Sequence, residues 1–371
     1  MMSRRWPFLA VLCTAVYGVD FKLYGVNYNS RQGPDWDPNR CKSQAQVDTD
    51  MVAIATVASR VRIFSLVDCN QGFMVTTAAK KAGLGIWLGM WVSNNQSSLN
   101  NELAALDALV TNNVVDNSIE GIHVGSESLY RKDITPDQAI NYFAAVKTYL
   151  GSKQLTFPVS ITDVLDTLLE YPQVISAVDI VMANAFPFWE QVDVDAAVNS
   201  FKTKFNTLVG AAHGKEVLIG ETGWPSAGVN TKASVASPIN QATYVANFAA
   251  FAAAAELKYF MFTAFDDLWK IAQEGVIDTV EAHFGLFDAT RNLKPELAYL
   301  TTGGYTPVGG DGNTAVRSGS SPTLFPIADG SATTTQVPQA PAQTSPAVPT
   351  NVRQWWRLAL GIALVLLLLP A

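Results

Sequence analysis

Short runs rich in β-branched and aromatic residues alternate with longer amphipathic runs along most of the chain, and this alternation constrains the fold most strongly. The strand-like runs are residues 23–28, 60–66, 84–91, 119–126, 157–162, 178–185, 216–221 and 258–265. The helical runs are residues 43–58, 72–82, 98–113, 135–150, a short or irregular helix after residue 162, then 194–212, 241–257 and 293–300. The chain therefore reads as eight strand-then-helix units.

Eight such units favour one architecture. Buried parallel strands read as continuous apolar runs, and right-handed crossovers place the helices outside the sheet. The unit count and a body of about 285 residues predict a single α/β domain folded as a closed (β/α)8 TIM barrel. An open doubly wound sheet is the alternative, but it usually carries a glycine-rich phosphate loop after its first strand. Here that position reads Asn27-Tyr28-Asn29-Ser30.

The beginning of the chain resembles a segment that is removed on export. Arg4 and Arg5 form a basic start, an apolar run covers residues 6–16, and small residues follow up to Gly18. This layout predicts a signal peptide over residues 1–18 and a barrel domain over residues 19–303. A buried first helix or strand is the alternative interpretation.

The other end changes character after Gly303. Ser, Thr, Pro, Gly and Ala dominate residues 304–345, and such a stretch cannot bury enough apolar surface to become ordered. We expect a disordered, O-glycosylated stalk there. Residues 346–371 end in an uncharged apolar tail with no basic segment after it, which predicts a GPI-anchor signal with attachment at Ser345. A single-span membrane anchor is the alternative.

Cysteine usage agrees with export. Cys13 lies in the expected signal peptide, which leaves Cys41 and Cys69 as a pair that could form a disulfide in an oxidising compartment. Two buried free thiols are the alternative. Asn95 begins the one glycosylation sequon, Asn-Gln-Ser. We therefore expect a secreted protein that is anchored through a GPI lipid to the outer face of the cell membrane or to the cell wall.

Two glutamates stand at the ends of expected strands. Glu127 follows the apolar strand 119–126, and Glu221 closes the strand 216–221. In a TIM barrel the catalytic side chains gather at the C-terminal ends of the strands. One carboxylate there could be a solvated side chain at the rim. Two of them, on strands four and seven, point to a catalytic pair.

The chemistry of glycosidic bond cleavage requires such a pair. One carboxylic acid protonates the departing oxygen, and a second, ionised carboxylate attacks or stabilises the anomeric carbon. We assign Glu127 as the acid/base, with its pKa raised by apolar surroundings and by its negative partner. We assign Glu221 as the nucleophile, kept ionised by neighbouring donors. The reverse assignment is the main alternative.

The segments around both glutamates resemble glycoside hydrolase family 17. Residues 218–226, Leu-Ile-Gly-Glu-Thr-Gly-Trp-Pro-Ser, are similar to that family's nucleophile motif, and residues 124–131 are similar to the acid/base segment of its fungal cell-wall branch. Many related barrels have Asn directly before the acid/base, where this chain has Ser126. Further similar segments are residues 24–28, 62–64, 262–270 and 281–287.

The resemblance implies a substrate. Together with the stalk and tail, the domain resembles GPI-anchored fungal endo-β-1,3-glucanases, which implies retaining, endo-acting hydrolysis of β-1,3-glucan in the cell wall by a monomer. The same two carboxylates could instead transfer a glucan chain to a sugar hydroxyl. A wall-anchored glucan-binding protein without activity is a third, non-enzymatic alternative.

Candidate substrate-binding residues fall at the expected strand ends. Sugars present apolar C–H faces to aromatic rings and hydroxyls to polar groups, which favours Tyr28, Asn184, Phe186 and Trp224. Core packing explains these residues equally well. A charged cluster of Asp267, Lys270 and Glu281 could bind hydroxyls or influence Glu221, or could be a plain salt-bridge network.

Other classes of ligand are disfavoured. The formal net charge of −7 argues against nucleic acid. The chain has three histidines, His123, His213 and His283, without ligand spacing, so we expect neither a metal nor a cofactor. We interpret His123, within strand four, as a buried barrel histidine.

Overall fold

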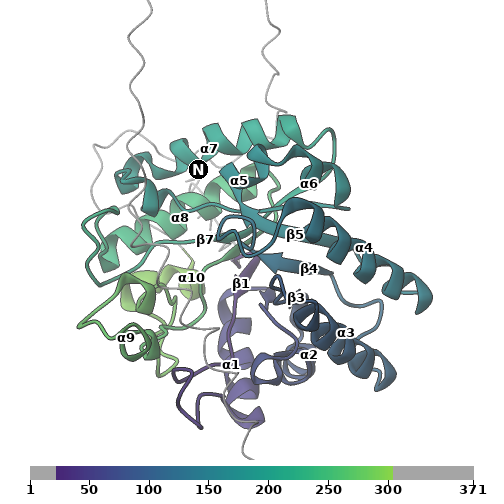
Figure 1. The fold of residues 1–371 in the computed structure, drawn as a ribbon. Coiled ribbons are helices and arrows are strands. Elements are labelled where there is room, and N and C mark those ends of the chain that lie inside the picture. The colour runs from purple at the N-terminus through teal and green to yellow at the C-terminus, as the bar shows by residue number, and fades with distance from the viewer. Residues whose placement is uncertain (1–21, 304–371) are drawn as a thin grey trace, which may run out of the picture.

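Eight parallel strands pair in sequence order, and the last pairs with the first to close a barrel (Figure 1). The structure is a computed structural model that describes residues 22–303. The strands are β1 Gly25–Asn27, β2 Arg60–Arg62, β3 Gly85–Met90, β4 Gly121–Ser126, β5 Val159–Val164, β6 Val181–Asn184, β7 Val217–Thr222 and β8 Tyr259–Met261. This confirms the predicted (β/α)8 barrel and excludes the open sheet.

Helices follow the strands and surround the barrel (Figure 1). The α-helices are α1 Gln44–Val57, α2 Gln71–Ala82, α3 Gln96–Thr111, α4 Pro136–Ser152, α5 Leu165–Glu170, α6 Pro172–Ala177, α7 Val194–Ala211, α8 Pro238–Ala254, α9 Trp269–Glu274 and α10 Tyr299–Thr302. Short 3-10 turns are η1 Asp68–Asn70, η2 Pro187–Glu190, η3 Val280–Ala282 and η4 Pro295–Leu297. The irregular helix expected after the fifth strand is the pair α5 and α6.

Some expected bounds differ from those observed. The eighth strand ends at Met261 rather than at residue 265, because Thr263 donates its N–H to the carbonyl of Phe284 instead of to a neighbouring strand. The expected last helix, residues 293–300, begins instead at Pro295 as η4 and continues as α10. Proline keeps the preceding residue extended, and Lys294 indeed has ψ 138°.

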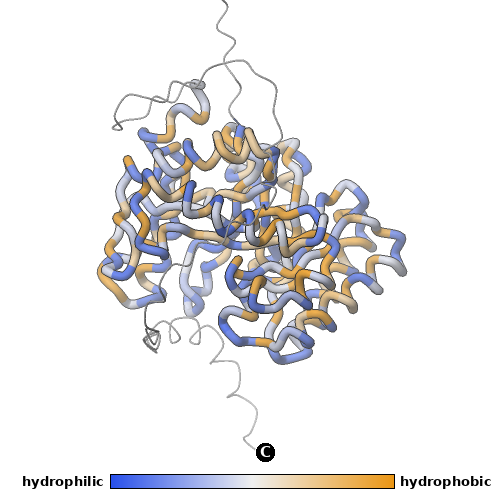
Figure 2. The backbone as a smooth tube through the Cα atoms, turned by 90° about the horizontal axis from the view of Figure 1, so that it is seen from above, coloured by the Kyte–Doolittle hydropathy of each residue, from blue (hydrophilic) through white to orange (hydrophobic). Residues whose placement is uncertain are grey.

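In the core enclosed by the strands, a glycine leaves room for a large side chain of a neighbouring strand. Trp87, Met182, Leu218 and Phe260 form a buried cluster. A Cβ on Gly121 would lie 2.4 Å from the Trp87 ring, so only glycine fits there. Figure 2 shows hydrophobic and hydrophilic stretches alternating along the surrounding helices, as expected for helices with one buried face.

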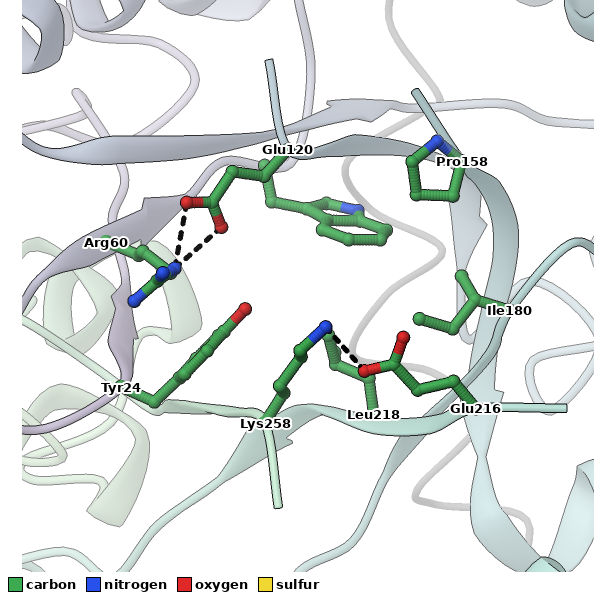
Figure 3. A pocket seen from close by; sticks show the side chains of 9 residues that line it. Tyr24, Arg60, Glu120, Pro158, Ile180, Glu216, Leu218 and Lys258 are labelled. Atoms are coloured by element: carbon green, nitrogen blue, oxygen red, sulfur yellow. Dashed lines mark hydrogen bonds and ion pairs between the residues drawn. The ribbon is translucent and has the colours of Figure 1, made fainter. Parts of the chain in front are cut away.

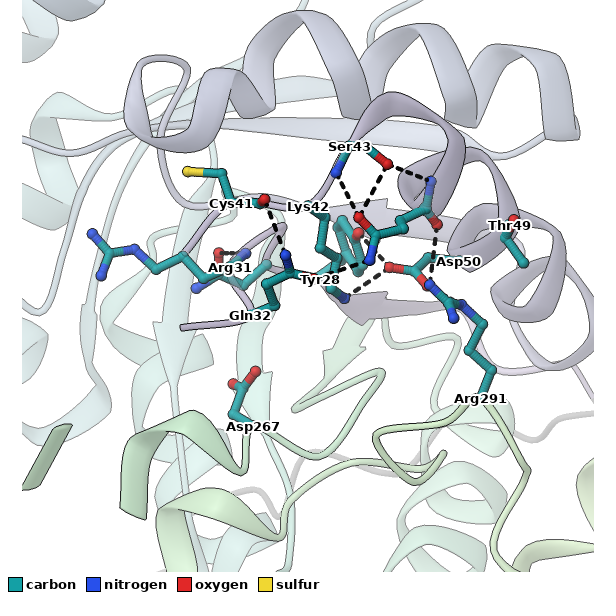
Figure 4. Close-up of polar contacts among 12 residues, drawn as sticks. Tyr28, Arg31, Gln32, Cys41, Lys42, Ser43, Thr49, Asp50, Asp267 and Arg291 are labelled. Carbon is teal, nitrogen blue, oxygen red and sulfur yellow. Dashed lines mark hydrogen bonds and ion pairs between the residues drawn. The ribbon is translucent and has the colours of Figure 1, made fainter. Parts of the chain in front are cut away.

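One disulfide and one buried carboxylate connect segments at the C-terminal end of the barrel. Cys41 and Cys69 form a disulfide with Cα atoms 5.2 Å apart, which confirms the predicted bond and joins the loops after β1 and β2. The buried carboxylate of Asp50, on α1, accepts hydrogen bonds from Tyr28 at 2.7 Å, Lys42 at 2.8 Å and Arg291 (Figure 4). Asp50 therefore connects the first strand and helix to the segment after β8.

Several predictions concern parts of the chain outside residues 22–303. The signal peptide, the stalk, the anchor signal and its attachment at Ser345 all lie there. Within residues 22–303, no helix is long and apolar enough to cross a membrane.

Candidate active site

Glu127 leaves the end of β4 in an unusual backbone conformation. Its φ is +56°, a left-handed value that costs a non-glycine residue on the order of 1–3 kcal/mol. The surroundings hold it there: its N–H donates to Thr162, and the buried carboxylate of Asp163, at the end of β5, accepts the next N–H groups from Leu129 and Tyr130 at 2.8 and 3.2 Å. Two adjacent strands thus fix the direction of the Glu127 side chain.

Glu221 lies near the end of β7 and is 7% exposed. Its Oε1 accepts hydrogen bonds from Arg62 Nη1 at 2.9 Å, Asn184 Nδ2 at 3.0 Å and Ser126 Oγ at 3.1 Å. The bond from Arg62 is charge-assisted, and such bonds are stronger than bonds between neutral groups. The expectation that neighbouring donors surround Glu221 is confirmed.

Asn184, at the end of β6, bridges the two carboxylates. Its Nδ2 lies 2.9 Å from Glu127 Oε1 and 3.0 Å from Glu221 Oε1. Because one nitrogen reaches both, these two oxygens are at most about 6 Å apart. Retaining glycosidases hold their carboxyl groups roughly 5–5.5 Å apart, and inverting ones roughly 6.5–9.5 Å. The bridge therefore agrees with a retaining geometry.

The two glutamates differ in their electrostatic surroundings. Burial, followed by the negative charge of Glu221, raises the pKa of Glu127 to about 7, although the hydrogen bond from Asn184 acts in the opposite direction. A carboxyl with this pKa retains its proton in mildly acidic solution and can donate it. Both predicted causes of the raised pKa are present.

Arg62, on β2, is a member of the site that sequence reasoning missed. Its guanidinium is fully buried, and besides Glu221 it contacts Ser126 Oγ at 3.3 Å and His123 Nε2 at 3.2 Å. Burial lowers the pKa of Arg62, while the charge of Glu221 acts to raise it. An arginine within a short buried strand was the available signal, since a buried cation requires a partner.

His123 and Ser126 both lie on β4 beneath the carboxylates. His123 is fully buried, as predicted, and burial together with the adjacent Arg62 lowers its pKa well below the usual range. A neutral imidazole can accept the Arg62 N–H at Nε2. Ser126 donates to Glu221 rather than toward Glu127. Its short side chain thus supports the nucleophile.

Phe186 and the charged cluster lie together beside this centre. Phe186 is half-buried, and its ring packs against Phe262 at 5.7 Å. Lys270 Nζ lies 5.3 Å above the ring of Phe262 and 3.5 Å from both Asp267 and Glu281. Burial opposes the charge of Lys270, but the two carboxylates raise its pKa overall. The three predicted charges therefore do form a cluster, with the geometry of a salt-bridge network.

Two of the aromatics predicted to bind sugar, Trp224 and Tyr28, are buried and have packing or hydrogen-bond partners within the domain. Trp224 is 1% exposed, packs against Phe188 at 5.2 Å, and donates its indole N–H to Val235 at 3.0 Å. Tyr28 is also 1% exposed, and its hydroxyl is bound to Asp50. Residues at a strand end can point outward into the layer between strands and helices, and both of these do.

Asn95, the predicted glycosylation site, lies directly before α3. Asn95 is exposed and caps α3, its Oδ1 accepting the N–H of Ser97 at 3.0 Å, so its glycosylation stays a prediction. Among residues 22–303 no group of three or more His, Cys, Asp or Glu side chains is arranged to hold a metal ion.

Comparison with known families agrees with this geometry. Residues 25–285 match the family described as the BtgE/BtgC glycoside hydrolase domain. The chain belongs to this family. The match contains all eight strands, both glutamates, Arg62 and Asn184.

Named relatives are fungal. A probable glucan endo-1,3-beta-glucosidase of Aspergillus fumigatus is 31% identical over 313 residues, which cover 78% of this chain and 44% of that protein. The chain therefore spans less than half the length of the first curated relatives it matches. A glucan 1,3-beta-glucosidase of Saccharomyces cerevisiae is 30% identical over 272 residues, covering 69% of this chain and 86% of that protein.

A solved structure is also similar. The glycoside hydrolase family 17 beta-1,3-glucanosyltransferase of Rhizomucor miehei is 34% identical, with a TM-score of 0.66. The likeness covers 74% of this chain and 96% of that one. At this identity the likeness extends beyond the shared barrel to the family.

Proposed function

We propose that this chain is a retaining, endo-acting hydrolase of β-1,3-glucosidic bonds. The observation that carries the proposal is the Asn184 bridge, which holds the Oε1 atoms of Glu127 and Glu221 at most about 6 Å apart, below the separation of an inverting pair. The named relatives support β-1,3-glucan as the substrate, since one is a probable glucan endo-1,3-beta-glucosidase and another is a glucan 1,3-beta-glucosidase.

The geometry suggests a division of the two chemical steps. In the first, Glu221 attacks the anomeric carbon while Glu127 protonates the departing oxygen. In the second, Glu127 removes a proton from water, which attacks the glycosyl-enzyme and releases Glu221. The raised pKa of Glu127 suits the protonated form needed at the start. The donors on Glu221 suit the ionised form needed for attack.

Product analysis on laminarin and on cellulose tests this proposal. Proton NMR of the first products should show release of the β-anomer from laminarin, with internal bonds cut early. Products that appear first as the α-anomer would contradict retention. A clear preference for cellulose would contradict the proposed substrate.

Transfer of the glucan chain is a second candidate, favoured by the likeness to the Rhizomucor miehei glucanosyltransferase. A transferase would use the same carboxylates, with a sugar hydroxyl in place of water in the second step. Incubation with a reduced laminarin oligosaccharide separates the two activities. Early products longer than the substrate would replace the hydrolase assignment by a transferase assignment.

A non-catalytic glucan-binding protein is the alternative from another class. The intact carboxylate pair disfavours it. The variant Glu221→Gln should bind laminarin oligosaccharides and lose turnover. An unchanged rate of turnover in that variant would contradict the catalytic role of Glu221.

The cell wall is the setting that we propose for this activity. Support comes from the export-type sequence at residues 1–18, the anchor-type sequence at residues 346–371, and the Cys41–Cys69 disulfide, which suits an oxidising compartment. Phospholipase C specific for phosphatidylinositol should release the protein from intact cells. Retention of the protein on treated membranes, combined with solubility only in detergent, would favour a single-span anchor.

A further inference from the structure

A recess lies at the opposite end of the barrel from the carboxylate pair. Figure 3 shows the side chains that line it. Glu120 precedes β4, which ends beside Glu127, and Glu216 precedes β7, which carries Glu221 near its end. At about 3.3 Å per strand residue, the recess is roughly 20 Å from the catalytic pair. Its volume is about 270 Å³.

The charged side chains around the recess are paired and balanced. Arg60 Nε donates to both oxygens of Glu120, at 2.8 and 2.7 Å, and Lys258 lies 2.6 Å from Glu216. Figure 3 shows Glu120 and Glu216 on opposite sides of the opening. Two cations against two carboxylates leave no net charge, which disfavours both a phosphate and a metal cation. These four side chains are between 28% and 47% exposed, so an entering molecule can reach them.

Apolar and aromatic surface completes the lining. The Tyr24 ring forms one wall, with the Arg60 guanidinium 4.2 Å from its centre. Trp87, Ile180 and Leu218 are buried and also line the recess. The Trp87 indole N–H has no hydrogen-bond partner within residues 22–303. A buried donor left without an acceptor costs on the order of 1–3 kcal/mol.

We propose that this recess binds the terminal sugar unit of a neutral polysaccharide, as a second saccharide site separate from the catalytic one. Sugars combine apolar C–H faces with hydroxyls that bind carboxylates and cations, and the recess offers each of these partners. Its volume is just below the range of about 300–1,000 Å³ typical of small-molecule sites, which suits one sugar ring rather than several. The choice of β-1,3-glucan as that polysaccharide rests on the proposed function.

The position of the recess sets what it can do. A trisaccharide cannot reach from one end of the barrel to the other around the outside, so it can occupy only one site at a time. A polymer, or a mesh of polymers, can engage both. The recess would therefore hold the enzyme on polymeric glucan without changing the chemical step.

A binding experiment tests the recess directly. The full chain carrying Glu221→Gln, which prevents turnover, is labelled with ¹⁵N and titrated with laminaritriose. The Trp87 indole signal is assigned by its loss in Trp87→Phe. We expect that signal to move saturably, and to stop moving when Glu216→Gln and Lys258→Met are added together. Removal of both partners leaves no unpaired charge at the recess.

A matched control uses another partly exposed ion pair. Lys153→Met with Asp107→Asn removes a lysine–aspartate pair that does not belong to the recess lining and should leave the Trp87 response unchanged. A Trp87 signal that laminaritriose does not move would overturn the proposal. So would a response that persists in the variant without Glu216 and Lys258.

Kinetic constants separate a binding role of the recess from a purely structural one, because a structural role would affect polymeric and short substrates alike. The double variant at Glu216 and Lys258 should raise KM for laminarin by about threefold to tenfold. It should leave kcat for both substrates, and KM for laminaritriose, unchanged. An unchanged KM for laminarin would contradict a role in holding polymer. If the wild-type chain cleaves no laminarin while the Trp87 signal still responds to saccharide, the proposed function fails and the second site stands.

Discussion

At the scale of single residues, the site is a shared hydrogen-bond system rather than two separate glutamates. Asn184 donates to both carboxylates, and Arg62 and Ser126 donate to Glu221 alone. The donors are thus distributed unequally, with three on Glu221 Oε1. This unequal distribution suits Glu127 to the acid/base role and Glu221 to the nucleophile role, although both lie at the same end of the barrel.

The assignment of the two roles can be checked with azide. With an aryl β-glucoside that has a good leaving group, Glu127→Ala plus azide should yield the β-glycosyl azide, because azide attacks the glycosyl-enzyme formed with Glu221. Glu221→Ala plus azide should yield the α-glycosyl azide, because azide takes the place of the missing nucleophile. Each product is identified by NMR. The reverse pattern would exchange the roles of the two glutamates.

The pH dependence follows from the pKa of Glu127. Its protonated form is the competent acid and its pKa is raised to about 7, so kcat/KM should fall as the pH rises through that value. In Glu221→Gln the neighbouring negative charge is removed, so the pKa of Glu127 should move down toward its ordinary value. Titration followed by ¹³C NMR of the glutamate carboxyl carbons measures this. An unchanged or higher pKa in the variant would contradict the electrostatic coupling.

At the scale of elements, the strand ends and the loops after them position the site. Only some of the site residues in these segments could be predicted from the sequence. Glu127 and Glu221 were identifiable because a charge directly after an apolar strand is unusual. Arg62 and Ser126 were not assigned, because their contacts depend on the register between strands that are distant in sequence. Tyr28 was predicted to bind sugar and is buried, because a strand-end position does not fix which way a ring points.

Removal of the disulfide should measure how much one loop link contributes. The bond between Cys41 and Cys69 closes 28 residues of chain, including α1. Replacing both cysteines by serine should lower the free energy of unfolding by about 3 kcal/mol, chiefly because the unfolded chain gains freedom. Urea unfolding of both proteins measures the difference. A loss well under 1 kcal/mol would mean that the unfolded chain is already restricted there.

At the scale of the whole molecule, the last strand of the barrel, β8, must pair with the first, β1. We call this junction and the segments beside it the seam, and ionic contacts reinforce it. Asp50 is 1% exposed and receives Arg291 from 241 positions later in the sequence. The isolated bridge between Phe265 and Phe287 lies in the same region after β8. The seam thus depends on contacts between the two ends of the domain, which no local sequence pattern could predict.

Loss of Asp50 should weaken the seam strongly. Asp50→Ala leaves Lys42 and Arg291 without their shared carboxylate, and breaking a buried ion pair typically costs about 3–5 kcal/mol. Asp48→Ala on the same helix is the matched control, since Asp48 pairs with the exposed Lys81 and its loss should change stability little. Thermal and urea unfolding compare the two. Equal losses in both variants would contradict the role of Asp50.

The fixed position of Arg62 has a further consequence for the second half of the proposed reaction. When Glu221 becomes an ester, it loses its charge, and the fully buried guanidinium beside it loses its paired carboxylate, while the negative charge passes to Glu127. A buried cation is most stable beside its paired carboxylate, so the glycosyl ester stands on a site that favours the Glu221 carboxylate. Arg62 thus makes Glu221 a better leaving group. The same ion pair that makes Glu221 a weaker nucleophile in the first step speeds the release of Glu221 in the second.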